Sequence, residues 1–275
     1  MRYLKLYWNF LKNCIKREIL YRFNFFVNIL TVVFGYVANI LFYFFVYNSG
    51  IESISGWSVY QVYVLLATVW IVDSLFGGVF FFNLIRIPMK VKNYELDGLL
   101  TKPVNPVFML ALRQFNLGLF SGVFFGIGFL IYAIKKGGLF VGVGEVLGYI
   151  LLVLCAVLLL FCVLFIMVTF SLKFVRIQGL IQMFWTLMEV GKNPHSIYPT
   201  ALKSIFTFLI PAIIIYNFPS QFLINDHFLE NMNNGITILI AILITVLWLF
   251  IAIWYFKKSL KYYYNWKRAS CIIQI

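Results

Sequence analysis

Long apolar stretches alternate with short polar segments along most of this sequence. A helix needs about 20 apolar residues to cross the hydrocarbon core of a membrane, which is roughly 30 Å thick. Six stretches meet this requirement, and we expect a transmembrane helix in each: residues 23–47, 59–83, 107–132, 145–170, 200–218 and 235–256. The predicted fold class is therefore all-α, as a polytopic membrane protein with six transmembrane helices between residues 23 and 256.

Residues 1–22 have a different pattern, with one apolar and one basic face at helical spacing. The apolar face consists of Leu4, Trp8, Leu11, Ile15 and Ile19. These positions fall within about 60° of one another at 100° per residue, and lysines occupy the opposite side. A helix of this kind lies in the membrane interface, with its basic face toward anionic lipid headgroups. We therefore expect an interfacial amphipathic helix with membrane lipid as its partner.

Two further apolar segments are too short or too interrupted to count as spans. Residues 177–190 contain Gln178, Gln182 and Glu189 within only 14 positions, so we expect them in the interface or against other helices. Pro211 lies inside the fifth predicted span. The short apolar stretch at 219–224 begins with a second proline.

The positions of Lys and Arg indicate how the chain is oriented in the membrane. Lys and Arg number 22 against 9 Asp and Glu, and 63% of the residues are hydrophobic. In a membrane protein, an excess of Lys and Arg marks cytoplasmic loops. With six spans, 20 of the 22 cations fall on one side, and Lys135 and Lys136 are the exceptions. The termini, including the tail 257–275, are therefore expected in the cytoplasm, and the positive charge does not indicate nucleic acid binding.

The segment 86–106 is the longest run in the first two thirds of the chain that could not sit in lipid. Leu96, Leu99 and Leu100 have the i, i+3, i+4 spacing of one helical face, and Glu95 and Asp97 point elsewhere. Prolines on both sides limit the helix to one or two turns: Pro88, Pro103 and Pro106. The pattern alone allows either a short amphipathic helix with a function or an ordinary loop between two spans.

Residues 94–108, YELDGLLTKPVNPVF, resemble the loop between the second and third membrane helices of export-type (type-2) ATP-binding-cassette permeases. A G/E-x-LD-x-LL-x-x-PVNP pattern recurs in that family. The run from NPHSIYP to IPAIIIYNFPS is similar to the fifth-helix region of the same permeases, which implies that 219–224 re-enters the membrane from outside.

The resemblance implies that 86–106 is a coupling loop that docks on a separate ATPase subunit. The implied contact residues are Glu95, Leu96, Asp97, Gly98, Leu99, Leu100 and Pro103. The leucines would insert into an apolar groove, and the acids would meet basic residues at its rim. The resemblance also implies a second permease subunit, either identical or different, in a bacterial plasma (inner) membrane, and transport of a substrate outward.

Motifs for chemistry on this chain itself are missing from the sequence. It has no G-x-x-x-x-G-K-[ST] phosphate loop, so ATP is expected on the partner ATPase and no cofactor on this chain. It has no H-E-x-x-H or C-x-x-C metal motif either, and His195 and His227 are expected to be ordinary polar loop residues. We expect no catalytic site and no metal. The four cysteines, Cys14, Cys155, Cys162 and Cys271, give no disulfide framework. The alternative functions are an ion-gradient-driven secondary transporter or channel, and a membrane scaffold.

Asp73 is an acid past the middle of the second predicted span. An ionisable group inside a membrane faces a partner or a water-filled path. Asp73 lies ten residues before Asn83, about 15 Å along a helix, and Arg113 lies about 9 Å into the third predicted span. Three alternatives remain open: an ion pair with Arg113, a role in the translocation path, or a different partner.

Three glycines of the third predicted span, Gly118, Gly122 and Gly126, repeat at intervals of four residues. Small residues at this spacing let another helix approach closely. We expect that helix to belong to the same subunit, and a subunit interface is the alternative.

Overall fold

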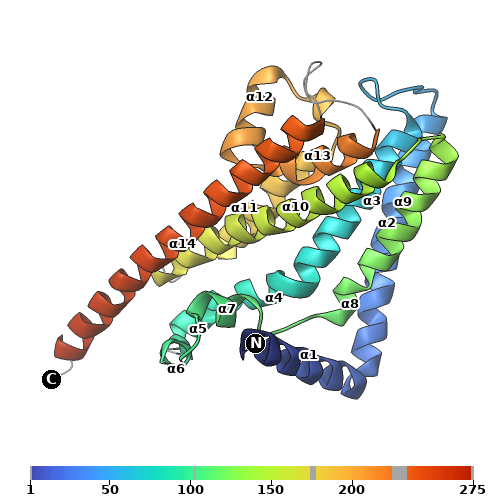
Figure 1. The fold of residues 1–275 in the computed structure, drawn as a ribbon. Helices are drawn as coiled ribbons and strands as arrows, with labels where there is room; N and C mark the ends of the chain where they lie inside the picture. The colour runs from blue at the N-terminus through green and yellow to red at the C-terminus, as the bar shows by residue number, and fades with distance from the viewer. Residues whose placement is uncertain (1, 94, 102, 174–177, 225–233, 274–275) are drawn as a thin grey trace.

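The computed structural model describes residues 2–93, 95–101, 103–173, 178–224 and 234–273, which are almost entirely helical and include no β-strand. The all-α fold class is therefore confirmed. In Figure 1, long helices run side by side, and shorter ones lie at both ends of the bundle. The first half contains α1 (Arg2–Leu20), α2 (Arg22–Asn48), α3 (Val59–Phe76), η1 (Gly77–Phe81), α4 (Phe82–Leu84), α5 (Ile87–Lys92), α6 (Glu95–Leu100), α7 (Pro106–Ala111), α8 (Leu117–Phe120) and α9 (Gly122–Gly137). The second half contains α10 (Val143–Thr169), η2 (Phe170–Leu172), α11 (Gln178–Gly191), η3 (His195–Ile197), α12 (Thr200–Ser204), η4 (Ile205–Leu209), α13 (Ala212–Ile224) and α14 (Asn234–Ile273).

Five helical stretches are long and apolar enough to cross a membrane: Arg22–Asn48, Val59–Lys92, Leu117–Gly137, Val143–Leu172 and Asn234–Tyr263. They correspond to the first, second, third, fourth and sixth predicted spans. A sixth candidate counts only if the bent pair Thr200–Leu209 and Ala212–Ile224 is taken as one span. The chain is therefore a multi-pass membrane protein.

The third span begins at Leu117, later than the expected residue 107. A non-helical connection after α7 causes the delay, and side-chain amides stabilise it. The Asn83 side chain donates to the Gln114 carbonyl at 2.6 Å and accepts from the Gln114 N–H at 2.8 Å. Asn116 then caps α8 by accepting from the Leu119 N–H at 2.9 Å.

α11, which the sequence prediction did not count as a span, carries the chain from the end of the bundle that holds α5 and α6 to the opposite end. Three contacts with the segment around α3 show the direction of the chain. Trp185 lies 5.3 Å from Phe81 between ring centroids, Lys192 pairs with Asp73, and His195 lies 6.0 Å from Trp57 between ring centroids. Residue numbers increase from Trp185 to His195, whereas the numbers of their partners decrease from Phe81 to Trp57. The chain from α11 to His195 therefore runs antiparallel to α3.

The predicted fifth span at 200–218 is not one continuous helix. The axes of Thr200–Leu209 and Ala212–Ile224 meet at 99°, and Pro211, which has no N–H for a continuing helix, lies at the break. Pro219 does not begin a separate segment, because α13 continues through it and every residue of α13 is buried. Figure 1 shows α12 and α13 at the end of the bundle opposite α1 and α6. Residues 225–233, which include His227, lie outside the described residues.

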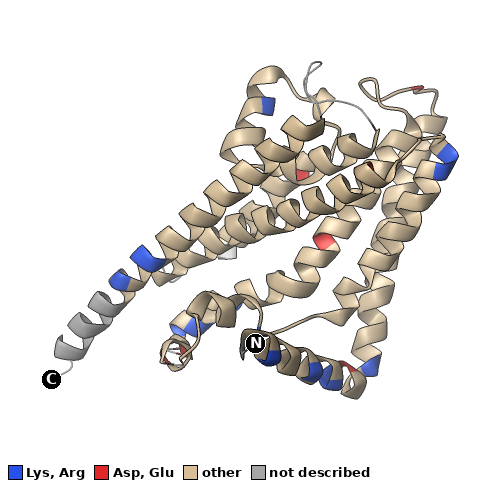
Figure 2. Ribbon diagram, viewed as in Figure 1, with Lys and Arg blue, Asp and Glu red and all other residues tan. Residues whose placement is uncertain are grey.

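The revised path changes the expected distribution of charge. Lys192 and Lys203 were assigned to the cytoplasmic side, but α11 carries the chain across before Lys192, and Lys203 lies on α12. Figure 2 still shows most cations at the end that holds α1 and α5, with others on α14.

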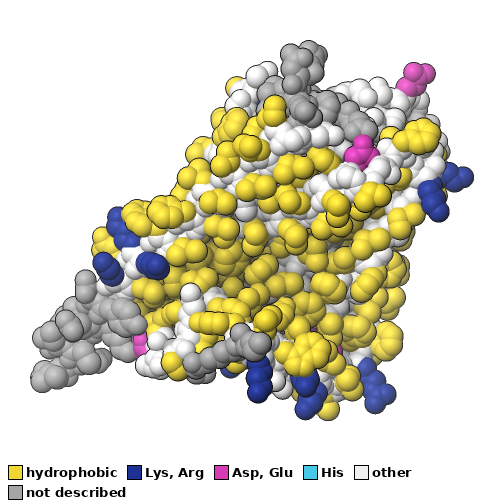
Figure 3. Space-filling view, viewed as in Figure 1, with side chains coloured by type: hydrophobic (Ala, Val, Ile, Leu, Met, Phe, Trp, Pro, Cys, Tyr) yellow, Lys and Arg dark blue, Asp and Glu magenta, His cyan; other side chains and the backbone are white. Residues whose placement is uncertain are grey.

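The surface between the two ends is apolar, as a membrane protein requires. Figure 3 shows a broad zone of hydrophobic side chains, with cations below it. Only 6% of the apolar window of α2 is buried inside the subunit, against 72% for the helix that begins with α3. α2 therefore presents most of its surface to lipid or to another chain, and α3 is at the centre of the fold.

Candidate functional site

The predicted coupling loop folds as two short helices, α5 and α6, at one end of the bundle (Figure 1). Pro88 lies in the first turn of α5, where its missing N–H costs nothing. Asn105 caps α7 on the far side, accepting from the Val107 N–H at 2.9 Å. The short helix expected at residues 95–100 is confirmed.

The leucines of α6 do not face outward, contrary to the expected docking surface. Leu96 is 0% exposed and Leu99 is 5% exposed, and both belong to the hydrophobic core of the subunit. Leu100 is partly buried against that core. The apolar face recognised in the sequence therefore attaches α6 to its own chain, where α5 and α7 pack against it.

The outer face of α6 is polar and open. Glu95 is exposed and accepts a hydrogen bond from Asn93 at 3.3 Å, and Pro103 is exposed beyond the helix. Asp97 is half-buried. Nothing lies within 4 Å of the position that a Cβ on Gly98 would take. We call the exposed Glu95 and Gly98, with exposed Met89 of α5, the outer face of the coupling segment.

Asp73 lies in α3, and its partners are Lys192 and Tyr216. The Lys192 ammonium is 3.2 Å from Asp73 Oδ2, and the Tyr216 hydroxyl donates to Asp73 Oδ1 at 2.6 Å. Glu189 is 2.8 Å from the same ammonium. Of the three alternatives left by the sequence, a different partner is the one observed, and the pair with Arg113 is wrong.

Arg113 lies elsewhere because the third span starts late. It is exposed in the connection between α7 and α8, next to the Gln114 that Asn83 holds. Asn83 is ten residues from Asp73 along the chain, so Arg113 stays at the coupling end of the bundle. The expected Asp73–Arg113 pair depended on a third span that begins at residue 107.

A groove of about 490 Å³ opens between α2, α3 and the end of α11, and Asp73, Glu189 and Lys192 lie on its wall. We call it the central groove. On α2 it is lined by Thr31, Gly35, Tyr36, Asn39 and Tyr43. Polar and charged groups are costly in hydrocarbon, so this wall is built to meet water, a polar solute or another protein surface.

The sequence matches the model of one family over residues 33–265, described as ABC-2 family transporter protein. The chain belongs to the ABC-2 transporter family. It is accordingly a permease subunit of an ABC transporter, a membrane component rather than an enzyme. No curated protein and no solved structure matches it.

Gly118, Gly122 and Gly126 of this ABC-2 permease pack within the subunit, as expected. A Cβ on Gly126 would lie 2.7 Å from Ile71 Cγ1 and 3.3 Å from the Ala67 carbonyl oxygen, both in α3. Gly122 meets Ser74 and Tyr36, and Gly118 meets Asn28 of α2. Gly118 and Gly126 thus allow α8 and α9 to approach α2 and α3.

His195 is not an ordinary loop residue in this permease, because it is buried. Its backbone N–H donates to Asn217 Oδ1 at 2.9 Å, and its ring contacts the Gln221 amide. The Asn217 amide also donates to the carbonyls of Gly191 and Asn193. Asn217 therefore joins α13 to the end of α11, and sequence patterns gave no signal for it. Among the described residues, no cluster of His, Cys, Asp and Glu could hold a metal ion.

The amphipathic helix α1 packs on the chain that follows α6, a contact that sequence reasoning did not anticipate. The Tyr3 ring is 5.0 Å from the Phe108 ring, and the Phe115 N–H donates to Cys14 Sγ at 3.3 Å. α1 therefore contacts the part of the chain that leads from α7 to α8.

Proposed function

We propose that this permease moves its substrate outward with energy from ATP, and that a separate ATPase subunit docks on the outer face of the coupling segment. The observation that carries the proposal is the orientation of α6: its leucines are buried in the permease, and Glu95 and Gly98 are left open. The open Gly98 allows close approach of a partner backbone. Glu95 supplies a negative charge at the rim, and ATP would bind the ATPase chain.

The buried leucines have a mechanical role in this proposal. Leu96 and Leu99 fix α6 to α5 and α7, and η1 and α4 continue α3 toward α5. A displacement of α6 by the ATPase is thus passed to α3, which carries Asp73. Helices attached by buried side chains move as units, because packed cores have little free volume.

The central groove is the proposed translocation path. It is polar, it contains an ion pair within the membrane part of the fold, and α3 forms one of its walls. A second permease subunit, identical or different, would complete the path on the exposed side of α2. Movement of α3 against α11 would change the Asp73–Lys192 contact and open the groove in turn to each side.

The charge distribution supports an orientation in which α1, the coupling segment and the end of α14 are cytoplasmic. We propose the plasma membrane of a bacterium as the location. The exposed apolar side chains of α1, such as Leu4 and Trp8, then enter the cytoplasmic leaflet of the membrane.

Purification of the tagged permease in mild detergent tests this proposal. We expect a P-loop ATPase chain in defined stoichiometry, identified by mass spectrometry, and ATP hydrolysis by the complex. Recovery of the permease without an ATPase from its native membrane, under conditions that keep a known ABC complex together, would contradict the proposal.

A further inference from the structure

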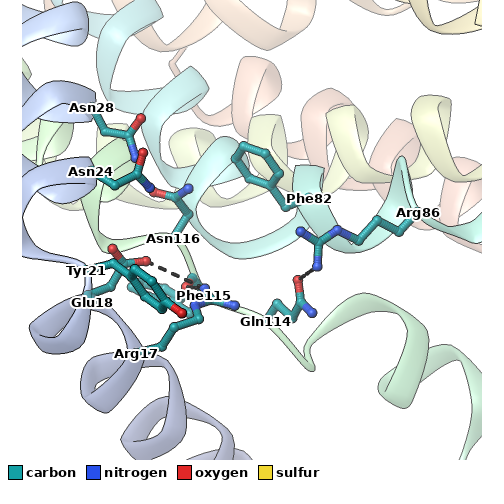
Figure 4. Close-up of a pocket in the computed structure, with 10 residues that line it drawn as sticks. All are labelled: Arg17, Glu18, Tyr21, Asn24, Asn28, Phe82, Arg86, Gln114, Phe115 and Asn116. Atoms are coloured by element: carbon teal, nitrogen blue, oxygen red, sulfur yellow. Dashed lines mark hydrogen bonds and ion pairs between the residues drawn. The ribbon is translucent and has the colours of Figure 1, made fainter.

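A second hollow, of about 440 Å³, lies at the bend between α1 and α2, and we call it the elbow pocket (Figure 4). Its walls come from the end of α1, the first turns of α2, the junction of α4 and α5, and the connection before α8. Three charged and three amide side chains matter for its chemistry: Arg17, Glu18, Arg86, Asn24, Asn28 and Asn116. In Figure 4 they surround a common space with Phe82 on one side.

The two arginines retain donors for an anion. Arg86 bonds to Gln114 through one nitrogen, which leaves its other guanidinium N–H groups for a ligand. Among the described residues, the contacts of Arg17 are long, at 3.5 Å to the Phe115 carbonyl and at 3.5 Å to Glu18. The planar guanidinium donates in a fork that matches phosphate oxygens.

The formal charge of the pocket defines the charge of the ligand. Two arginines and Glu18 give a net charge of +1, which a phosphodiester with one negative charge neutralises. Asn24 and Asn28 add hydrogen-bonding capacity on α2 without adding charge. Glu18 can accept hydrogen bonds from hydroxyl groups of a glycerol attached to the phosphate.

Exposed apolar residues at the bend, of which Tyr21 lines the pocket, indicate that the phosphate belongs to a lipid. Leu20 is 74% exposed, Tyr21 is 61% exposed and Phe23 is 82% exposed, and all three lie where α1 turns into the first span. A soluble phosphate would leave this apolar surface uncovered, whereas acyl chains beside the headgroup would cover it. The amphipathic α1 places the elbow at the membrane surface.

We propose that the elbow pocket binds the phosphodiester headgroup of an anionic lipid with a glycerol headgroup, from the leaflet that contacts α1. Arg86 and Arg17 hold the phosphate, and the α2 amides and Glu18 hold the hydroxyl groups. The site is formed by the permease alone, so it does not depend on the proposed ATPase or on transport.

Binding of fluorescently labelled phosphatidylglycerol to the full-length permease, in detergent at physiological salt, tests this inference. We expect Arg86→Gln to weaken binding by about tenfold, as loss of a charge-assisted hydrogen bond predicts. Asn24→Leu, which removes an amide without changing charge, should also weaken it.

Lys16→Gln removes a neighbouring exposed cation outside the pocket, and binding should change by less than about twofold. Unfolding midpoints without added lipid show whether each variant is folded. If Arg86→Gln does not fold, Asn24→Leu still tests the proposal.

Three results would overturn the proposal. An effect of Lys16→Gln equal to that of Arg86→Gln would mean general attraction to a basic surface. Binding of sn-glycerol 3-phosphate as tight as that of the lipid would identify a site for soluble phosphates. Equal binding of phosphatidylethanolamine, with the same loss in the Arg86 variant, would show that the site does not select anionic lipid.

Discussion

The carboxylate of Asp73 and the ammonium of Lys192 form an ion pair inside the membrane part of the bundle, with 3.2 Å between Oδ2 and Nζ. Their side chains are 23% and 21% exposed, toward the central groove. Lys192 also pairs with Glu189, whereas Asp73 is held in addition by Tyr216. Replacing Asp73 therefore leaves Lys192 with an acidic partner, whereas replacing Lys192 leaves Asp73 with only a neutral hydrogen-bond donor.

Lys192→Gln should destabilise the permease more than Asp73→Asn. Loss of the lysine strands the carboxylate of Asp73, at a cost of about 2–3 kcal/mol, between the values for exposed and fully buried pairs. After Asp73→Asn the lysine keeps Glu189. The double variant should recover much of the loss in the unfolding midpoint. Arg113→Gln is the control and should have little effect, and a loss there equal to that of Lys192→Gln would contradict the observed pairing.

Tyr216→Phe removes the hydroxyl donor to Asp73 and leaves the ring in place. We expect a loss of about 1–3 kcal/mol in the free energy of unfolding, since the bond is to a charged group. The loss should be smaller in an Asp73→Asn background, because the amide oxygen of Asn accepts only a neutral hydrogen bond from the hydroxyl. Equal losses in both backgrounds would show that the hydroxyl does not act through Asp73.

Gly126→Ala should destabilise the permease by about 1–3 kcal/mol, because the added methyl group overlaps Ile71 and the α3 backbone. Gly128→Ala, two residues further along the same helix, has nothing within 4 Å of the new methyl group and should be neutral or slightly stabilising. The measurement is thermal unfolding of both variants in detergent. Equal midpoints would be incompatible with close packing of α9 on α3.

Leu96→Ala tests the inward orientation of α6. We expect a loss of about 2–5 kcal/mol locally, as for other buried leucines, and faster hydrogen exchange of the amides at 95–101. Glu95→Ala, on the exposed side, should leave exchange close to the wild-type rate. Unchanged exchange in Leu96→Ala, measured without any ATPase, would mean that the leucine is not buried.

The sequence predicted the parts of the fold that depend on local composition. The spans that correspond to α2, α3, α10 and α14 are long and uniformly apolar, and α1 has a regular two-faced pattern. α11 was not counted as a span because it has only 14 residues and contains Gln178, Gln182 and Glu189. Pro211 was placed inside the fifth predicted span, and it separates two helices that meet at 99°.

The Asp73–Lys192 pair could not be predicted, because it depends on the position of α11 against α3. The residues are 119 positions apart, and Lys192 was assigned to a cytoplasmic loop. The apolar spacing of Leu96, Leu99 and Leu100 correctly predicted a helix, but a helical face has the same spacing whether it packs on its own chain or on a partner. Only the burial of Leu96 and Leu99 distinguishes these cases.

The central claim is that an ATPase docks on the outer face of the coupling segment, and a pair of matched glycine variants tests it most directly. Gly98 and Gly144 are both exposed, helical and free of neighbours within 4 Å of an added Cβ, but they lie near opposite ends of the bundle. A large side chain at either position should leave the permease folded. The measurement is the amount of ATPase copurified with Gly98→Trp and with Gly144→Trp, at equal permease recovery and equal unfolding midpoint. We expect Gly98→Trp to lose the ATPase and Gly144→Trp to retain it, and full retention by a folded Gly98→Trp would contradict the account.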